Sequence, residues 1–93
     1  MNSEISLTKK LRVKNELGLH TRPATVIVKF LQQVKSDVFF TYKKETVDAK
    51  SILNLLMLAA QKNAEISIFV RGLDAKETLD GLVEVFENKF GEL

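Results

Sequence analysis

One short stretch of the sequence contains the residues best suited to nucleophilic chemistry and phosphate binding. It is Gly18-Leu19-His20-Thr21-Arg22-Pro23-Ala24, which holds the only histidine and the only proline among the 93 residues. A neutral imidazole is a nucleophile near pH 7, because its unperturbed pKa is about 6.5. Arg22 adds a forked cation that suits phosphate oxygens. His20 beside Arg22 therefore predicts a phosphohistidine carrier; the alternative is an ordinary capping or surface histidine.

The same stretch has the composition of a helix start. We expect Thr21 to be the N-cap, with its hydroxyl accepting from the amide three residues on. Pro23 would lie in the first turn, where it needs no N–H. A helix start carries unpaired amides and the positive end of the helix dipole, so it can bind an anion. We expect the donors to be the amides of Thr21, Arg22 and Ala24, with His20 just ahead of the turn.

The strands that must position this site are indicated by alternating apolar and polar residues. Such alternation runs through residues 7–15 and returns at residues 38–42. Residues 46–47 follow a polar turn without glycine and suggest a short return strand. Residues 66–70 alternate again and predict the last strand. Each of these strands has one face suited to a core.

Three segments have helical periodicity instead. Residues 22–35 place one apolar stripe on a common face: Ala24, Ile27, Val28, Leu31 and Val34. Residues 51–60 are apolar on nearly every side, and Asn63 is suited to a left-handed exit from that helix. Asp74 and Glu77 form a capping pair that starts the final helix, and Gly91 closes it. The order β-α-β-β-α-β-α predicts one α+β domain over residues 1–93, an antiparallel sheet with helices on one face.

The helix at residues 51–60 has more apolar side chains than a small core can cover. Three of them can face the core: Leu55, Leu58 and Ala59. Three others are left on a different face: Ile52, Leu53 and Leu56. An exposed apolar patch on a small protein usually marks a partner site. The alternative is that this short helix is completely buried.

Composition limits the remaining classes of function. The chain has no cysteine and one histidine, so no metal site and no cofactor are indicated. Residues 1–4 show no signal pattern, and the longest apolar run, residues 55–60, is far shorter than the ~20 residues that cross a bilayer. We therefore expect a cytoplasmic monomer with no membrane insertion. A net charge of +2 is too small to indicate nucleic acid by itself.

Two motifs together give the sequence a family resemblance. Gly18-Leu19-His20-Thr21-Arg22-Pro23-Ala24 is followed by Ala49-Lys50-Ser51-Ile52-Leu53, with Ser51 lying 31 positions after the histidine. Both resemble the histidine-containing phosphocarrier protein (HPr) family of the bacterial phosphoenolpyruvate-dependent sugar phosphotransferase system, and the pattern continues from about residue 11 to residue 90 without a gap. The resemblance implies an open-faced β-sandwich with four strands and three helices.

The same resemblance implies roles for individual residues. Enzyme I would phosphorylate His20 on a ring nitrogen, enzyme IIA proteins would receive the group, and Arg22 would assist, so the chain is a carrier and not a free-standing enzyme. Ser51 would be the target of a carrier-specific serine kinase and phosphorylase, although it could also be only an N-cap. Partners would dock on a surface made of Thr21, Arg22, Ile52, Leu53 and Leu56. Asp48 departs from the family pattern, and whether the pathway moves sugars or only regulates stays open.

An RNA-binding module is the alternative from another class. Phe39 and Phe69 occupy the outward phase of their strands, the first strand is basic, and the element order is similar to that of RNA-recognition sheets. Against it, the glycine- and aromatic-rich signature of such sheets is missing around both phenylalanines. The nearly balanced charge also argues against it, so we expect no nucleic-acid partner.

Overall fold

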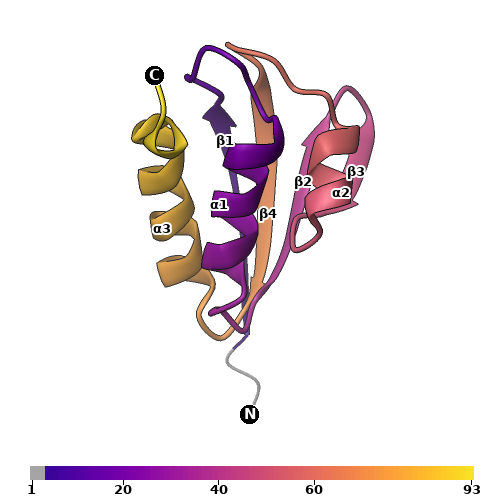
Figure 1. The fold of residues 1–93 in the computed structure, drawn as a ribbon. Helices are drawn as coiled ribbons and strands as arrows, with labels where there is room; N and C mark the ends of the chain where they lie inside the picture. The colour runs from indigo at the N-terminus through magenta and orange to yellow at the C-terminus, as the bar shows by residue number, and fades with distance from the viewer. Residues whose placement is uncertain (1–3) are drawn as a thin grey trace.

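The computed structural model describes residues 4–93, which form a sheet covered by helices (Figure 1). The strands are β1 (Ile5–Arg12), β2 (Asp37–Tyr42), β3 (Glu45–Asp48) and β4 (Glu65–Gly72). The helices are α1 (Thr21–Leu31), α2 (Ile52–Met57) and α3 (Ala75–Glu87), followed by a short 3₁₀ helix, η1 (Lys89–Gly91). The order and the open-faced sheet confirm the predicted fold. The missing signal pattern was expected of residues 1–4, and residues 1–3 lie outside the described residues.

The four strands form one antiparallel sheet in the order β1-β4-β2-β3. Side chains alternate between its two faces; the inward ones of β4 are buried, as are Val38 and Phe40 of β2, while Tyr42 is half-buried. Phe39 and Phe69 lie directly opposite each other on the outward face, with ring centroids 6.4 Å apart. Each ring is half-buried, since a cross-strand aromatic pair shields part of its own surface.

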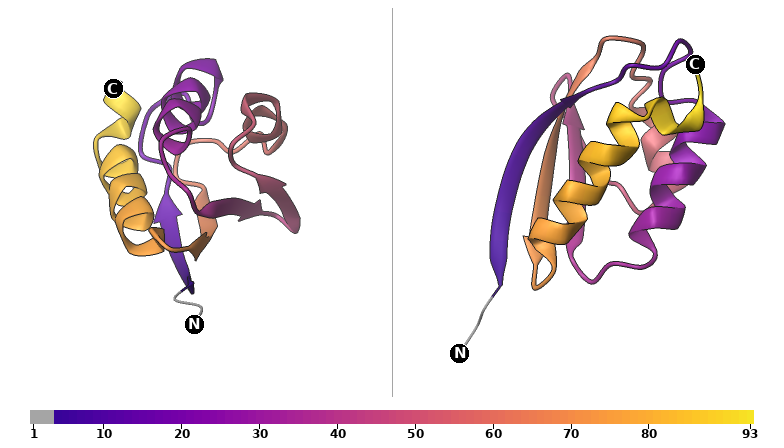
Figure 2. Two further views of the ribbon diagram at one scale, coloured as in Figure 1. Left: turned by 90° about the horizontal axis from the view of Figure 1, so that it is seen from below. Right: turned by 90° about the vertical axis from the view of Figure 1, so that its left-hand side faces the viewer.

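All three α-helices cover the same face of the sheet, and the core lies between the two layers (Figure 2). The apolar stripe of α1 points into this core as predicted: Ala24, Ile27, Val28 and Leu31 are buried, and Val34 packs partly against them. Leu55 and Leu58 are buried as predicted. Within residues 4–93, no helix has the length and apolar content to span a bilayer.

Several elements end earlier than the sequence predicted. Helix α1 ends at Leu31 instead of residue 35, because the amides of Lys35 and Ser36 donate to the Asp74 carboxylate at 2.9 Å each. Strand β1 ends at Arg12 instead of residue 15. Helix α2 ends at Met57, and Ala59 adopts a left-handed φ of 52°. Ala59 is therefore exposed, and its predicted place in the core was wrong.

The start of α3 also differs from the prediction. Asp74 is the N-cap residue by position, but its side chain makes no bond to its own helix, so the predicted pair with Glu77 was wrong. The carboxylate instead holds the α1–β2 connection, accepting also from the Ser36 hydroxyl at 2.6 Å. Helix α3 ends at Glu87, and Gly91 ends η1 instead. Asn63 has the expected left-handed φ, 73°, but it leads into β4 after the helix has already ended.

Candidate functional site

His20 lies at the end of the loop that connects β1 to α1. This loop is pressed against residues 60–64, since the amide of Leu19 donates to the Ala60 carbonyl at 2.9 Å. Gly18 adopts a φ of 73°, and a Cβ there would come within 2.5 Å of the same carbonyl oxygen. Only glycine combines this backbone conformation with so close an approach. The loop thus fixes the position at which His20 enters α1.

His20 itself is the N-cap of α1, so the predicted N-cap role of Thr21 was wrong. The His20 carbonyl accepts from the Ala24 amide at 3.1 Å, while no side chain caps the helix. The Ala24 amide is consequently not the free donor that we expected. Among the described residues, none accepts a hydrogen bond from the amide of Thr21 or Arg22. Two of the three expected backbone donors are thus available to an anion.

A carboxylate from the C-terminal segment contacts the histidine ring. The Nε2 atom of His20 lies 3.0 Å from both side-chain oxygens of Glu92. Arg22 Nε lies 3.7 Å from Glu92 Oε2, and Asn15 Nδ2 donates to Glu92 Oε1 at 2.8 Å. The Glu92 side chain is only 10% exposed, whereas Arg22 is 74% exposed and can reorient. Three nitrogen-bearing side chains therefore surround one nearly buried carboxylate.

These contacts determine that Glu92 is ionised and which ring nitrogen of His20 carries the hydrogen. The hydrogen bond with His20 is the largest cause that lowers the pKa of Glu92, and burial opposes it. The hydrogen bond from Asn15 and the charges of His20 and Arg22 lower the pKa further. An ionised carboxylate only accepts hydrogen bonds, so Nε2 of His20 must carry a hydrogen. In the neutral ring this leaves the lone pair on Nδ1.

The C-terminal segment is anchored on both sides of Glu92. Phe90 is buried against Phe86, with ring centroids 4.9 Å apart. The amide of Glu16 donates to the Leu93 carbonyl at 2.8 Å. Asn15 is fully buried, and its Nδ2 donates at 2.8 Å to the Gly18 carbonyl as well as to Glu92. Asn15 thus ties the loop before His20 to the end of the chain.

The sequence analysis did not identify Asn15 or Glu92. Asn15 could have been found from the sequence. It follows Leu11 and Val13 at alternating positions, so its side chain points inward with theirs, and a buried polar side chain needs a hydrogen-bond partner. Glu92 has no comparable signal, since its contact with His20 spans 72 residues of sequence.

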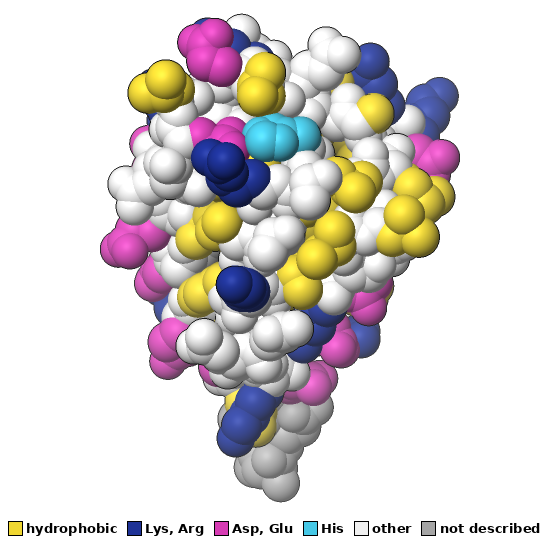
Figure 3. Space-filling model, viewed as in Figure 1, with side chains coloured by type: hydrophobic (Ala, Val, Ile, Leu, Met, Phe, Trp, Pro, Cys, Tyr) yellow, Lys and Arg dark blue, Asp and Glu magenta, His cyan; other side chains and the backbone are white. Residues whose placement is uncertain are grey.

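An apolar surface lies on the same face of the molecule. Figure 3 shows the histidine beside a cationic and an acidic side chain, with apolar side chains spread over the neighbouring helices. Ile52 and Leu53 are exposed, as is Met57, and Leu56 is half-buried. The expected exposure is confirmed for Ile52 and Leu53 but not for Leu56, which packs partly against the core. Complete burial was wrong, and Met57 is an exposed apolar residue that the sequence analysis missed. Thr21 and Arg22 are exposed at the start of α1.

A pocket of about 460 Å³ opens between the β1–α1 loop, the start of α1 and the C-terminal segment. It is lined by Glu16, Leu17, Arg22, Gly91, Glu92 and Leu93.

Within residues 4–93, no three His, Cys, Asp or Glu side chains are grouped so that they could hold a metal ion.

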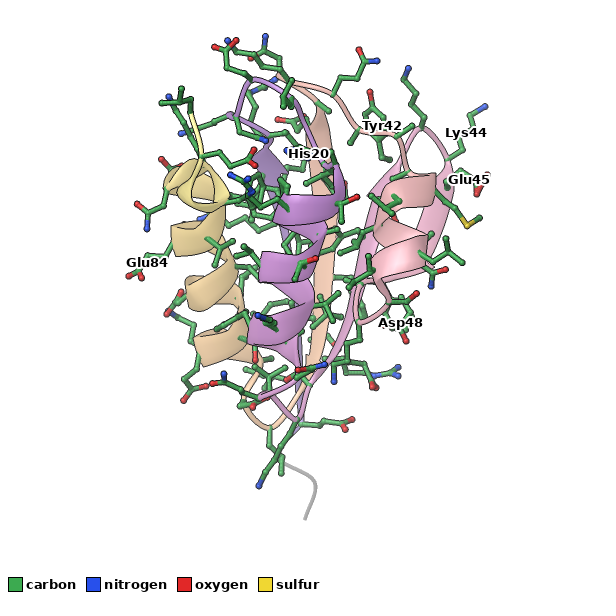
Figure 4. The ribbon with its side chains drawn as sticks, in the orientation of Figure 1. His20, Tyr42, Lys44, Glu45, Asp48 and Glu84 are labelled. Atoms are coloured by element: carbon green, nitrogen blue, oxygen red, sulfur yellow. The ribbon has the colours of Figure 1, made fainter. Side chains whose placement is uncertain are left out.

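Ser51 is the N-cap of α2, as its alternative role predicted. Its Oγ accepts from the Asn54 amide at 3.2 Å. The carboxylate of Asp48 accepts from the Lys50 amide at 2.9 Å and so belongs to the turn that precedes Ser51. Figure 4 places His20 at the upper end of α1 and Asp48 below α2, so Asp48 does not approach the histidine.

Known proteins resemble this chain over most of its length. A family model described as "PTS HPr component phosphorylation site" matches residues 7–88. A phosphocarrier protein HPr of Chlamydia pneumoniae is 43% identical over 81 residues, which are 87% of this chain and 75% of that protein. A phosphocarrier protein HPr of Xylella fastidiosa is 35% identical over 92% of this chain and 97% of its own. The crystal structure of HPr-C-His from Thermoanaerobacter tengcongensis superimposes with a TM-score of 0.89 at 30% identity, covering 94% of this chain and 98% of the other.

Proposed function

Because this chain belongs to the HPr family of phosphocarrier proteins of the phosphotransferase system, we propose that His20 accepts a phosphoryl group from enzyme I and passes it to enzyme IIA proteins. One observation carries the assignment to His20. Glu92 holds the Nε2–H of the ring, so the lone pair lies on Nδ1, and the free amides of Thr21 and Arg22 lie in the adjoining helix turn.

The transfer step follows from that geometry. The Nδ1 lone pair attacks the phosphorus of the group carried by enzyme I. A bond from Nδ1 to phosphorus forms while the bond from phosphorus to its donor atom breaks, and the bonding electron pair leaves with that donor atom. The Nε2 proton stays on the ring, which becomes positively charged. The reverse sequence delivers the group to an enzyme IIA acceptor.

Arg22 and the helix start would stabilise the transferred group. The amides of Thr21 and Arg22 can donate to the phosphoryl oxygens, and the helix dipole favours negative charge there. The Arg22 guanidinium is largely exposed, so it can turn from Glu92 toward those oxygens. The two backbone amides and the Arg22 guanidinium would thus together stabilise the negative charge of the phosphoryl group.

The apolar patch of Ile52, Leu53 and Leu56, with Thr21 and Arg22 beside it, would be the docking surface. An apolar centre flanked by a cation suits acidic partners that bind transiently and dissociate quickly. We propose that enzyme I and enzyme IIA use this surface in turn, and that the carrier acts as a cytoplasmic monomer without nucleic acid or membrane insertion.

Regulation at Ser51 is a further part of the proposal. A carrier-specific serine kinase would phosphorylate Ser51, and a phosphorylase would reverse it. Support comes from the position of Ser51 at the start of α2, directly before the exposed Ile52 and Leu53. A phosphate tolerated by the helix start would bring negative charge to the edge of the docking surface.

Incubation with enzyme I and labelled phosphoenolpyruvate tests the central assignment. We expect acid-labile label on the parent protein and none on His20→Ala, because the chain has no other histidine. Gln32→Ala, an exposed change just beyond the far end of α1, is the matched control and should take label normally. Label on His20→Ala would disprove the role of His20. An unlabelled parent protein would favour the RNA-binding alternative over a carrier.

A further inference from the structure

Glu92 is the one charged group that contacts both His20 and Arg22 among the described side chains. It does so from the C-terminal segment, and its side chain is nearly buried although the residue lies next to the chain end. Burying a carboxylate costs free energy unless it is paired and hydrogen-bonded. Glu92 meets that condition with His20, Asn15 and Arg22. Its position is therefore specified by this site.

The support behind Glu92 is also specific. Asn15 is fully buried and donates both to the Gly18 carbonyl and to Glu92, so the loop before His20 and the carboxylate share one donor group. The amide of Glu92 donates to the Lys89 carbonyl at 2.9 Å, and buried Phe90 fixes the chain between them. A carboxylate held in this way can orient the imidazole that it contacts.

Building on the proposed transfer at His20, we propose that Glu92 is a positioning residue for it. Glu92 holds the ring in the tautomer with hydrogen on Nε2, turns Nδ1 toward the incoming group, and neutralises the positive ring that forms when Nδ1 binds phosphorus. The arrangement uses the same logic as a carboxylate that orients a catalytic histidine in a triad. Here the oriented histidine is the nucleophile itself.

Two variants separate positioning from a merely structural contact. Glu92→Leu removes the acceptor, whereas Glu92→Gln keeps an oxygen that can accept from Nε2–H and from Asn15 but removes the charge. We expect ¹⁵N NMR of the neutral ring to show hydrogen on Nε2 in the parent and in Glu92→Gln, and a mixture of tautomers in Glu92→Leu. Phosphoryl acceptance from enzyme I should fall roughly 10- to 100-fold in Glu92→Leu, the range typical when a carboxylate that orients a metal-binding histidine is removed. Glu92→Gln should lie between parent and Glu92→Leu.

Glu87→Leu is the matched control. Glu87 is also an acidic residue near the C-terminus that pairs with the loop before α1, through Lys14 at 2.7 Å, but it does not contact His20. It should keep the parent tautomer and rate. A parent-like tautomer and rate in Glu92→Leu would overturn the proposal. If the amide spectrum shows that Glu92→Leu disturbs the fold, Glu92→Gln decides: slower acceptance with the parent tautomer supports the proposal, and the parent rate overturns it.

The same experiment distinguishes this inference from the proposed function. The tautomer is measured on the free protein and requires no transfer. An unlabelled parent protein would end the carrier role of His20 and leave the hydrogen bond from Glu92 to be judged by the tautomer alone. A labelled parent with no effect of Glu92→Leu would end only the role of Glu92.

Discussion

The Nε2 atom of His20 and the carboxylate of Glu92 lie 3.0 Å apart across 72 residues of sequence. Because the hydrogen bond from His20 is the largest cause that lowers the pKa of Glu92, we expect His20→Ala to raise that pKa toward its ordinary value. A titration followed by ¹³C NMR of the carboxyl carbon measures the change. An unaltered Glu92 pKa in His20→Ala would contradict the assigned hydrogen bond.

The same pair makes stability depend on pH in a defined direction. A carboxyl group whose pKa is lowered by folding stabilises the protein above its unfolded pKa, about 4.3 for Glu, and this contribution is lost as pH falls through the folded pKa. The difference in free energy of unfolding between parent and His20→Ala should therefore shrink below about pH 4. Denaturant unfolding at several pH values measures it. A difference that grows as pH falls below about 4 would have the wrong sign.

Arg22→Ala should slow phosphoryl acceptance without abolishing it. The free amides of Thr21 and Arg22 and the helix dipole remain to hold the anion, so we expect roughly a tenfold loss, equivalent to about 1.4 kcal/mol of transition-state stabilisation. Arg22→Lys should recover part of the rate, since lysine keeps the charge but not the fork. Lys29→Ala, an exposed cation at the other end of α1, is the control. Equal rates in parent and Arg22→Ala would remove Arg22 from the mechanism.

The docking surface can be tested with two leucines of similar exposure. Leu53 is 67% exposed within the patch, and Leu73 is 63% exposed between β4 and α3. Figure 1 shows this connection at the opposite end of the molecule from the start of α1. Leu53→Glu should weaken binding to enzyme I, because it removes apolar surface and adds charge facing an acidic partner. Leu73→Glu should bind like the parent, and both should fold normally. Chemical-shift changes confined to the opposite sheet face on adding enzyme I would contradict this surface.

The features that the sequence predicted well are those set by local patterns. Alternation at residues 66–70 and the stripe of Ala24, Ile27 and Leu31 follow from burial on one face, so the strands, the helices and their packing could be predicted. The exposed Leu53 could be predicted because too little chain remains to cover a helix that is apolar on nearly every side.

The features that the sequence missed depend on contacts between distant segments. The local sequence predicts that the Asp74 side chain caps α3. Its carboxylate instead accepts from the amides of residues 35 and 36, and these hydrogen bonds end α1 early. Thr21 reads as an N-cap, but the loop fixed by Gly18 makes His20 the N-cap instead. Glu92 reaches the histidine because buried Phe90 and the hydrogen bond from the Glu16 amide to the Leu93 carbonyl anchor the C-terminal segment. Local propensity contains none of this information.

Ser51 has the clearest local role and the regulatory role that is easiest to test. As N-cap of α2 its hydroxyl accepts from the Asn54 amide, a contact typically worth ~1 kcal/mol, so Ser51→Ala should lower stability by about that amount. Ser51→Asp keeps an acceptor at the helix start and should fold normally. Its added charge lies next to Ile52 and Leu53, where it would have to be desolvated against acidic groups of enzyme I.

We therefore expect Ser51→Asp to accept phosphate from enzyme I more slowly than Ser51→Ala, with His20 unchanged in both. A phosphoserine, with about −1.5 to −2 charges, should have the larger effect. Initial rates at limiting carrier concentration measure docking to enzyme I. Unfolding curves measure the stability lost with the N-cap contact, so the two effects can be distinguished. Asp37→Asn, which alters an exposed charge paired with Arg71 on the sheet, is the control that should change neither. If both Ser51 variants run at the parent rate and no kinase from the source organism labels Ser51, this serine is an N-cap and has no regulatory role.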